Sequence, residues 1–126
     1  MKTAADIESY LIRLGTPFDQ IGGEMWNVTA EHENVVISLA GPLLVFRTKV
    51  MDVPSKNREA LFEELLRLNT TDLVHGAFGI EGKSVVINHA LELENLDYNE
   101  FSAVVDDFSM SLNKHYAALT KFREPS

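Results

Sequence analysis

The side chains of this sequence best suited to hold a metal ion or to transfer a proton are its four histidines, His32, His75, His89 and His115. His32 stands between two glutamates in a polar turn, Glu31-His32-Glu33, but this spacing matches no metal-binding motif. Turns rich in Glu and His are usually solvated, so we expect no metal there. His115 falls in the last turns of a predicted helix, where a positive charge is favourable beside the helix dipole.

His75 and His89 lie on two predicted strands that are joined at Glu81-Gly82. With a two-residue turn there, His75 is opposite Asn88. His89 is then opposite Val74, and the two histidine rings point to opposite faces of the sheet and share no metal. A three-residue turn would instead bring the rings face to face. We favour the two-residue turn, which predicts that both histidines are structural or surface residues and that the chain has no metal site.

Other arrangements that carry catalysis or bind a cofactor are not recognisable in the sequence. The chain has no cysteine, no nucleophile-elbow sequence, no phosphate-binding Walker motif and no glycine-rich dinucleotide fingerprint. Asp106 and Asp107 are adjacent carboxylates, but neighbours on a helix point about 100° apart and do not act on one substrate atom. We therefore expect a protein that is not an enzyme and needs no cofactor. Trp26, the single tryptophan, is either a core residue or, if exposed, an anchor for a bound peptide.

The composition is that of an ordinary folded domain with an acidic surface. The chain has 126 residues, of which 45% are hydrophobic and 24% charged, and its formal net charge is −8. This length fits one domain, residues 1–126, with one hydrophobic core. The negative charge disfavours nucleic acid and anionic membranes as partners, whereas it suits a basic or disordered client polypeptide. No segment reads as a signal peptide or a membrane span, so we expect a cytoplasmic protein.

A first helix is predicted over residues 4–14. Thr3 and Asp6 have the spacing of a capping box, and Gly15 is a suitable C-terminal stop. The apolar residues of this helix form one stripe, Ala4, Ile7, Tyr10, Leu11 and Leu14. Ile12 lies outside the stripe. It is either a single surface aliphatic residue, which many proteins have, or part of a second apolar face for a partner.

Residues 18–53 are predicted to form an antiparallel meander of about three strands, drawn from the segments 18–21, 24–29, 34–40 and 43–53. A second helix follows at about 56–69 with Ser55 as its N-cap, and then come two strands, 72–80 and 83–93. The order α-β-β-β-α-β-β-α predicts an α+β fold, in which helices pack on a twisted antiparallel sheet.

The last helix is predicted to begin at Asp97, which has capping-box spacing with Glu100. It carries one apolar stripe over about six turns. The stripe consists of Phe101, Val104, Val105, Phe108, Leu112, Tyr116 and Leu119. A helix with such a stripe must lie on an apolar surface, and the hairpin just before it is the nearest candidate.

The second predicted helix is apolar around more than half of its circumference, at Leu61, Phe62, Leu65, Leu66 and Leu68. One core-facing stripe needs fewer apolar residues, and a helix of this kind is usually buried on two sides. In a small domain the second side is often covered by another subunit.

One pattern of apolar residues and glycines is specific enough to compare with known families. It consists of Leu65-Leu66-Arg67-Leu68-Asn69, then Gly76, Phe78 and Ile80, the turn at Gly82, and the strand Val85-Val86-Ile87. This pattern resembles the type III secretion chaperone fold, in particular its YbjN-like family. The resemblance implies a homodimer paired through Leu61, Phe62 and Leu65. It also implies client contacts on the first helix and the sheet, at Ile7, Leu11, Ile12, Met25 and Trp26.

Two functions remain open from the sequence. The first is a non-enzymatic protein-binding module, a dimeric chaperone-like protein that holds an extended or partly unfolded client in apolar grooves or by strand addition to a sheet edge. It predicts an exposed apolar patch larger than a monomer usually has. The alternative is a small regulatory or ligand-sensing domain with a pocket between helix and sheet, in which polar groups such as His75 or His89 converge.

Overall fold

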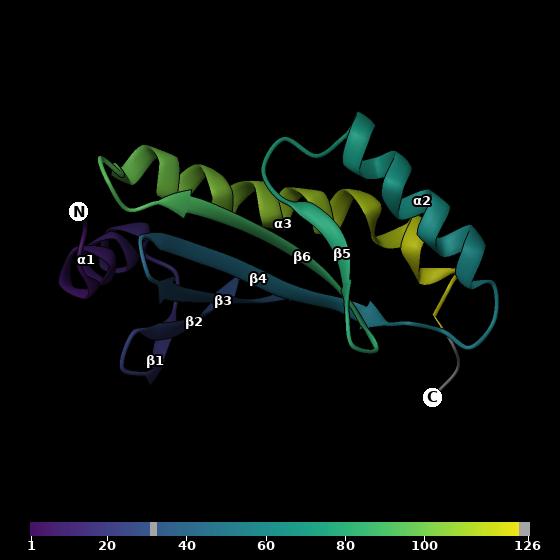
Figure 1. Cartoon of the computed structure of the whole chain (residues 1–126), viewed down its shortest axis with the longest axis horizontal. Coiled ribbons are helices and arrows are strands. Elements are labelled where there is room, and N and C mark those ends of the chain that lie inside the picture. The colour runs from purple at the N-terminus through teal and green to yellow at the C-terminus, as the bar shows by residue number, and fades with distance from the viewer. Residues whose placement is uncertain (31–32, 124–126) are drawn as a thin grey trace.

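Three helices pack against a six-stranded sheet in the computed structural model, which describes residues 1–30 and 33–123 (Figure 1). The elements are α1 (Ala4–Leu14), β1 (Phe18–Gly22), β2 (Met25–Ala30), β3 (Glu33–Ala40), β4 (Leu43–Asp52), α2 (Arg58–Thr71), β5 (Ala77–Glu81), β6 (Ser84–Glu92) and α3 (Tyr98–Thr120). The predicted α+β class is confirmed. The predicted order lacked one strand, because all four candidate segments between α1 and α2 form strands.

The sheet is antiparallel throughout, and its strands lie in the order β1-β2-β3-β4-β6-β5. β1 and β5 are therefore its two edges. Figure 1 shows α1 at the end of the molecule that carries β1 and β2, and α2 at the opposite end beside β5. The long helix α3 runs along the sheet between them. The two edges of the sheet thus have different neighbours.

Aromatic packing holds α3 on the sheet. The helix begins as predicted, because Asp97 and Glu100 each accept the backbone N–H of the other in a capping box. Phe46 of β4 packs against both Phe101 and Phe108 of α3, with ring centroids 5.7 and 6.3 Å apart. These contacts fix the position of α3 along the strand at the centre of the sheet.

One member of the predicted α3 stripe is wrong. Tyr116 is exposed, and its neighbour His115 is buried in its place. The other six predicted residues are buried, namely Phe101, Val104, Val105, Phe108, Leu112 and Leu119. The predicted stripe advances by four residues from Phe108 to Leu112 and by four again to Tyr116. Each step exceeds the 3.6 residues of a helical turn, so the second one leaves the buried side of the helix.

The first helix has the predicted bounds and caps. Thr3 and Asp6 form the capping box, and Gly15 ends α1 in the left-handed conformation, with φ of 77°. Ile7 and Leu11 are fully buried in the same hydrophobic cluster as Trp26 of β2. The predicted stripe of α1 therefore faces the core.

The second helix is displaced by two residues from its predicted range. Its N-cap is Asn57, in the left-handed conformation with φ of 60°, and not Ser55. At the other end α2 continues to Thr71. Its buried side is formed by Leu61, Leu65 and Leu68.

The hairpin of β5 and β6 turns one residue later than predicted. Its two-residue turn is 82–83 instead of 81–82, and the glycine at position 82 has the expected positive φ, 60°. The register consequently shifts by two residues. Ala77, and not His75, pairs with Asn88.

Residues 72–76 form the connection between the second helix and the fifth strand, here called the α2–β5 loop. The strand therefore begins at Ala77, five residues later than predicted. Gly76 has φ of 89°, a conformation that favours glycine. A Cβ at this position would lie 2.9 Å from Phe108 Cε1 and 3.0 Å from the Asn88 carbonyl oxygen, so a larger residue would displace its neighbours.

Candidate protein-binding site

The five residues predicted to contact a client do not form one surface. Ile7, Leu11 and Trp26 are fully buried, so their side chains are unavailable to a partner of the folded chain. This also answers the question that the sequence left open for Trp26, which is a core residue. Ile12 and Met25 are exposed. The predicted client surface is thereby reduced to these two side chains.

The outer edge of β1 has backbone groups that are free to pair with a strand. The Pro17 carbonyl accepts the N–H of Thr29 at 2.9 Å. Because backbone groups alternate in direction along an antiparallel strand, those of Phe18 and Gln20 point away from β2. Within the described residues, β1 pairs with β2 alone. An extended peptide would find unpaired donors and acceptors here.

Exposed apolar side chains lie beside this open edge. Met25 of β2 pairs with Gly22 of β1, and Ile21 immediately before Gly22 is exposed as well. Ile12 is exposed on α1, which the chain connects directly to β1. The sequence placed Ile21 in a strand but gave no sign of its exposure, because the irregular register at Gly22 breaks the alternation of inward and outward residues.

A side chain of α2 closes the opposite edge of the sheet, at β5. The Asn69 amide oxygen accepts the N–H of Phe78 at 2.7 Å, and the Asn69 amide nitrogen donates to the Phe78 carbonyl at 3.1 Å. Asn69 thus makes both hydrogen bonds that a residue of a further strand would make. Unpaired edge strands associate readily with other chains, so this contact protects β5 at Phe78, whereas the backbone groups of Ile80, two residues further on, point the same way beyond the reach of these two hydrogen bonds.

The outer side of α2 carries a second exposed apolar surface. Of the three predicted dimer residues, Leu61 and Leu65 are buried within the chain and Phe62 is half-buried. Leu66, about one helical turn after Phe62, is 67% exposed. The two residues line a shallow groove, here called the α2 groove, together with Glu59, Glu63, Arg67, Thr70 and Thr71.

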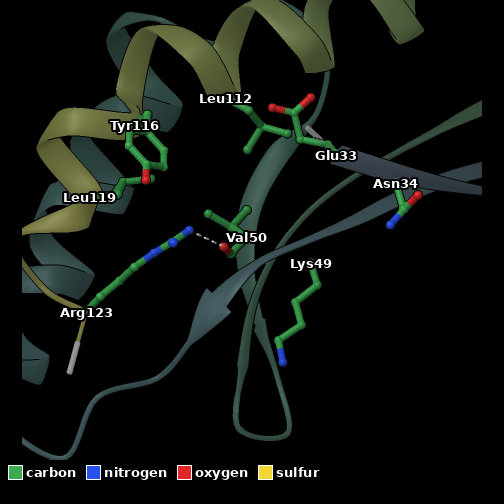
Figure 2. A pocket seen from close by; sticks show the side chains of 8 residues that line it. All are labelled: Glu33, Asn34, Lys49, Val50, Leu112, Tyr116, Leu119 and Arg123. Atoms are coloured by element: carbon green, nitrogen blue, oxygen red, sulfur yellow. Dashed lines mark hydrogen bonds between the residues drawn. The ribbon is translucent and has the colours of Figure 1, made fainter. Parts of the chain in front are cut away.

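A pocket of about 330 Å³ lies between α3 and the strands β3 and β4 (Figure 2). β3 and β4 pair with each other only as far as Val36 and Arg47. The pocket lies beyond that point, where the two strands continue without pairing with each other. Its lining combines apolar and polar side chains, namely Glu33, Asn34, Lys49, Val50, Leu112, Tyr116, Leu119 and Arg123. It is the feature of the fold closest to the predicted pocket between helix and sheet.

The basic groups at this pocket are directed to partners of the chain itself. Lys49 pairs with Asp52 at 2.7 Å, and Figure 2 shows its side chain directed away from Leu112. Arg123 donates to the Val50 carbonyl at 3.0 Å. The polar groups therefore do not converge on one point, and the lining contains neither of the histidines considered for a ligand site. The ligand-sensing alternative gains no support from this geometry.

Ionisable side chains hold the last residues of the α2–β5 loop. His75 Nδ1 contacts Asp107 Oδ2 of α3, and His89 Nδ1 of β6 accepts the N–H of Gly76 at 3.0 Å. The His75 and His89 rings meet edge to face with centroids 5.6 Å apart. The prediction that they lie on opposite sheet faces was wrong, because His75 belongs to the loop and not to a strand.

The protonation of His89 is shifted by these surroundings. Burial lowers the pKa of His89 below its ordinary value of 6.5, and the nearby His75 lowers it further. A neutral His89 ring agrees with the hydrogen bond, since only an unprotonated Nδ1 accepts the N–H of Gly76.

The first residue of the loop is held in a different way. Asp72 lies 3.3 Å from Lys114 Nζ and 3.4 Å from His115 Nε2, both on α3. Hydrogen bonds from Thr71 and Lys114 lower the pKa of the Asp72 carboxyl. Asp72 therefore stays charged at the mildly acidic pH at which histidines titrate.

Within the described part of the chain, no group of three His, Cys, Asp or Glu side chains is arranged to hold a metal ion. Glu31 and His32 of the polar turn considered above lie outside the described residues. None of the helices in residues 1–30 and 33–123 combines the length and apolar character needed to span a bilayer.

A comparison with protein-family models finds a match over residues 1–124, almost the whole chain. The chain belongs to the CesT_Tir_1 family of type III secretion chaperones. This confirms the resemblance inferred from the pattern between residues 65 and 87. No curated protein matches the sequence.

Solved structures with the same fold include chaperone complexes. A chain of the heterodimeric ExoU–SpcU complex, from the type III secretion system of Pseudomonas aeruginosa, matches with a TM-score of 0.71 and 15% identity, over 95% of this chain and 99% of that one. YbjN from E. coli matches with a TM-score of 0.70 and 16% identity, over 93% of each chain. The HopA1–SchA chaperone–effector complex contains a chain that matches with a TM-score of 0.63 and 10% identity, over 84% and 86%. Because all three identities are low, these matches show a shared fold and nothing further about this chain.

Proposed function

We propose that this chain is a non-enzymatic, chaperone-like protein of the cytoplasm that holds an extended segment of another polypeptide on the edge of β1. The observation that carries the proposal is the contrast between the two sheet edges. Asn69 pairs with both outward backbone groups of Phe78 on β5, whereas those of Phe18 and Gln20 on β1 point outward with β2 as the only strand partner in the described residues. Membership of a chaperone family supports a protein partner, and so does the similar HopA1–SchA structure, which is a chaperone–effector complex.

The chemistry of the client follows from the side chains beside this edge. A strand added to β1 would gain main-chain hydrogen bonds that are independent of its sequence. Its apolar side chains would cover Ile21, which precedes Gly22 in β1, and Met25 of β2, which pairs with Gly22, and a segment that continues towards α1 would cover Ile12. The net charge of −8 favours a client segment that is basic.

A strand-blocking substitution tests this proposal. Gln20→Pro removes an outward N–H and leaves the β1–β2 hydrogen bonds in place, because proline is tolerated on an edge where its nitrogen faces solvent. Gln20→Thr is the matched control, since it also loses the hydrogen bond from the Gln20 side chain to Gly23 but keeps the backbone N–H. Reduced, carbamidomethylated lysozyme, a basic and permanently unfolded chain, serves as the client, with binding followed by fluorescence anisotropy.

We expect Gln20→Pro to weaken binding about tenfold or more, because one hydrogen bond is lost and the proline ring obstructs the added strand. Gln20→Thr is expected to bind like the unmodified chain. Equal binding by all three proteins, with circular dichroism showing an intact fold, would exclude strand addition at β1.

We further propose that the chain forms a homodimer through the α2 groove. Phe62 and Leu66 would pack on the same residues of a second copy, with Leu61 and Leu65 supporting them from inside the chain. Glu63 and Arg67, which pair with each other along the helix, would give each copy both signs of charge at the rim. A surface that carries both signs can place opposite charges against each other when it meets itself across a two-fold axis.

Leu66→Asp is the test of the dimer, because it buries a charge in the proposed contact. Met110→Asp is the control, since Met110 on α3 is 66% exposed against 67% for Leu66 and lies outside the groove. Light scattering coupled to size-exclusion chromatography is expected to give a dimer for the unmodified chain and for Met110→Asp, and a monomer for Leu66→Asp. A dimer of the Leu66→Asp protein would place the interface elsewhere.

A further inference from the structure

We propose that the hydrogen bond from the Gly76 N–H to His89 is a pH-sensitive switch: a proton taken up by His89 releases the α2–β5 loop and uncovers the edge of β5. His89 Nδ1 lies 3.0 Å from the Gly76 nitrogen and uses its lone pair to accept that N–H. Protonation places a hydrogen on Nδ1, so two N–H groups then face each other and the hydrogen bond is lost.

The surroundings of His89 make the charged ring unfavourable from more than one side. The centroid of the His75 ring, in the α2–β5 loop, lies 5.6 Å from that of His89, and Asp107 of α3 contacts Nδ1 of the His75 ring. On β4 the residue paired with His89 is the apolar Phe46. Asp107 is thus engaged with His75, and within residues 1–30 and 33–123 no carboxylate pairs with His89. Release of the loop relieves this by giving the charged ring access to water.

The other end of the loop stays anchored in the same pH range. Asp72 remains charged because its pKa is lowered, and it stays close to Lys114 and His115 on α3. The loop is therefore released at its Gly76 end first. This end leads directly into β5, so the freed segment includes the start of the strand.

The edge of β5 is the surface that this release affects. Phe78 follows Gly76 by two residues, and its backbone N–H and carbonyl hold Asn69. Movement of the strand start separates Phe78 from Asn69 and leaves both backbone groups unpaired. The β5 edge then becomes a second strand-pairing surface at mildly acidic pH.

Hydrogen exchange of the backbone amides, measured between pH 7.5 and 5.5 and corrected for the intrinsic pH dependence of exchange, tests the proposal. If opening takes up one proton, the equilibrium constant for opening at the Gly76 amide rises about tenfold for each unit by which the pH falls, once His89 titrates. The Phe78 amide is expected to follow with the same pH midpoint. His89→Asn places an amide oxygen near the position of Nδ1 and cannot titrate, so it is expected to abolish this rise and keep both amides protected.

His115→Gln is the matched control, because it removes the other histidine that touches the loop and keeps a polar group near the position of Nε2. Its amides are expected to show the same pH response as the unmodified chain. The proposal is overturned if His89→Asn retains the response, or if His115→Gln abolishes it. A third variant, His89→Leu, lacks any acceptor and is expected to expose the Gly76 amide at every pH; protection of that amide in His89→Leu would also overturn the proposal.

Discussion

Replacing Asn69 by alanine removes the two hydrogen bonds that close the edge of β5. Each hydrogen bond of this kind contributes about 0.5–1.5 kcal/mol net, so the pair contributes about 2 kcal/mol. Alanine is the better helix former by roughly 0.6 kcal/mol, which offsets part of the loss because Asn69 lies in α2. We expect Asn69→Ala to lower the free energy of unfolding by about 1–2 kcal/mol.

Urea unfolding followed by circular dichroism measures this change, at one fixed protein concentration because dimer formation would otherwise contribute. Thr70→Ala is the control, since Thr70 is the next residue of α2 and its hydroxyl donates to the Leu66 carbonyl of its own helix. Thr70→Ala is expected to stay within about 0.5 kcal/mol of the unmodified chain.

Hydrogen exchange at the Phe78 amide supplies an independent reading of the same variants. Asn69→Ala is expected to lose protection at this amide, whereas Thr70→Ala keeps it. If Asn69→Ala unfolds at the same urea concentration as Thr70→Ala and Phe78 stays protected, Asn69 does not act as a substitute for a strand.

Three further outcomes concern single residues of the sheet and the α2–β5 loop. Thr48 is buried and its hydroxyl makes no hydrogen bond within the described residues, so Thr48→Val is expected to raise the free energy of unfolding by about 1 kcal/mol in the same urea assay; a loss of stability would show that the hydroxyl has a partner. Gly76→Ala combines a positive φ with a Cβ 2.9 Å from Phe108, and is expected to destabilise by about 2 kcal/mol or more, whereas an unchanged urea midpoint would show that the loop relaxes freely. The pKa of His89 is lower in the folded chain than in the unfolded one, so the unfolded chain binds the proton first and the free energy of unfolding falls as the pH drops below about 6.5. His89→Asn is expected to reduce this dependence of stability on pH. If the substitution leaves it unchanged, another group is responsible.

The parts of the fold that could be predicted are those encoded locally. The capping boxes of Thr3 with Asp6 and of Asp97 with Glu100 formed as expected, because each depends on residues three apart. The positive φ of the hairpin glycine at position 82 was likewise a local property. Apolar periodicity was enough to give the class and nearly the whole order of elements.

The parts that failed depend on contacts between elements. The apolar pattern of α2 covers so much of its circumference that it does not reveal which side faces the core, and packing places Leu61 and Leu65 inside while Leu66 is exposed. His75 was assigned to a strand because Asp72 to Ile80 is rich in apolar residues, but α2 continues to Thr71 and the next five residues form a loop. The pairing of the Asn69 side chain with the β5 backbone could not be predicted from the sequence, since its partner Phe78 belongs to another element.

The unequal edges of the sheet also limit how copies of this chain can associate. A head-to-tail fibre built by joining sheets would need β1 of one molecule to meet β5 of the next. Asn69 already holds the backbone groups of Phe78 on the receiving side, so each such joint would have to displace it before two sheets could pair there. The same contact that fastens α2 to the edge strand therefore disfavours growth of a fibre from the folded chain.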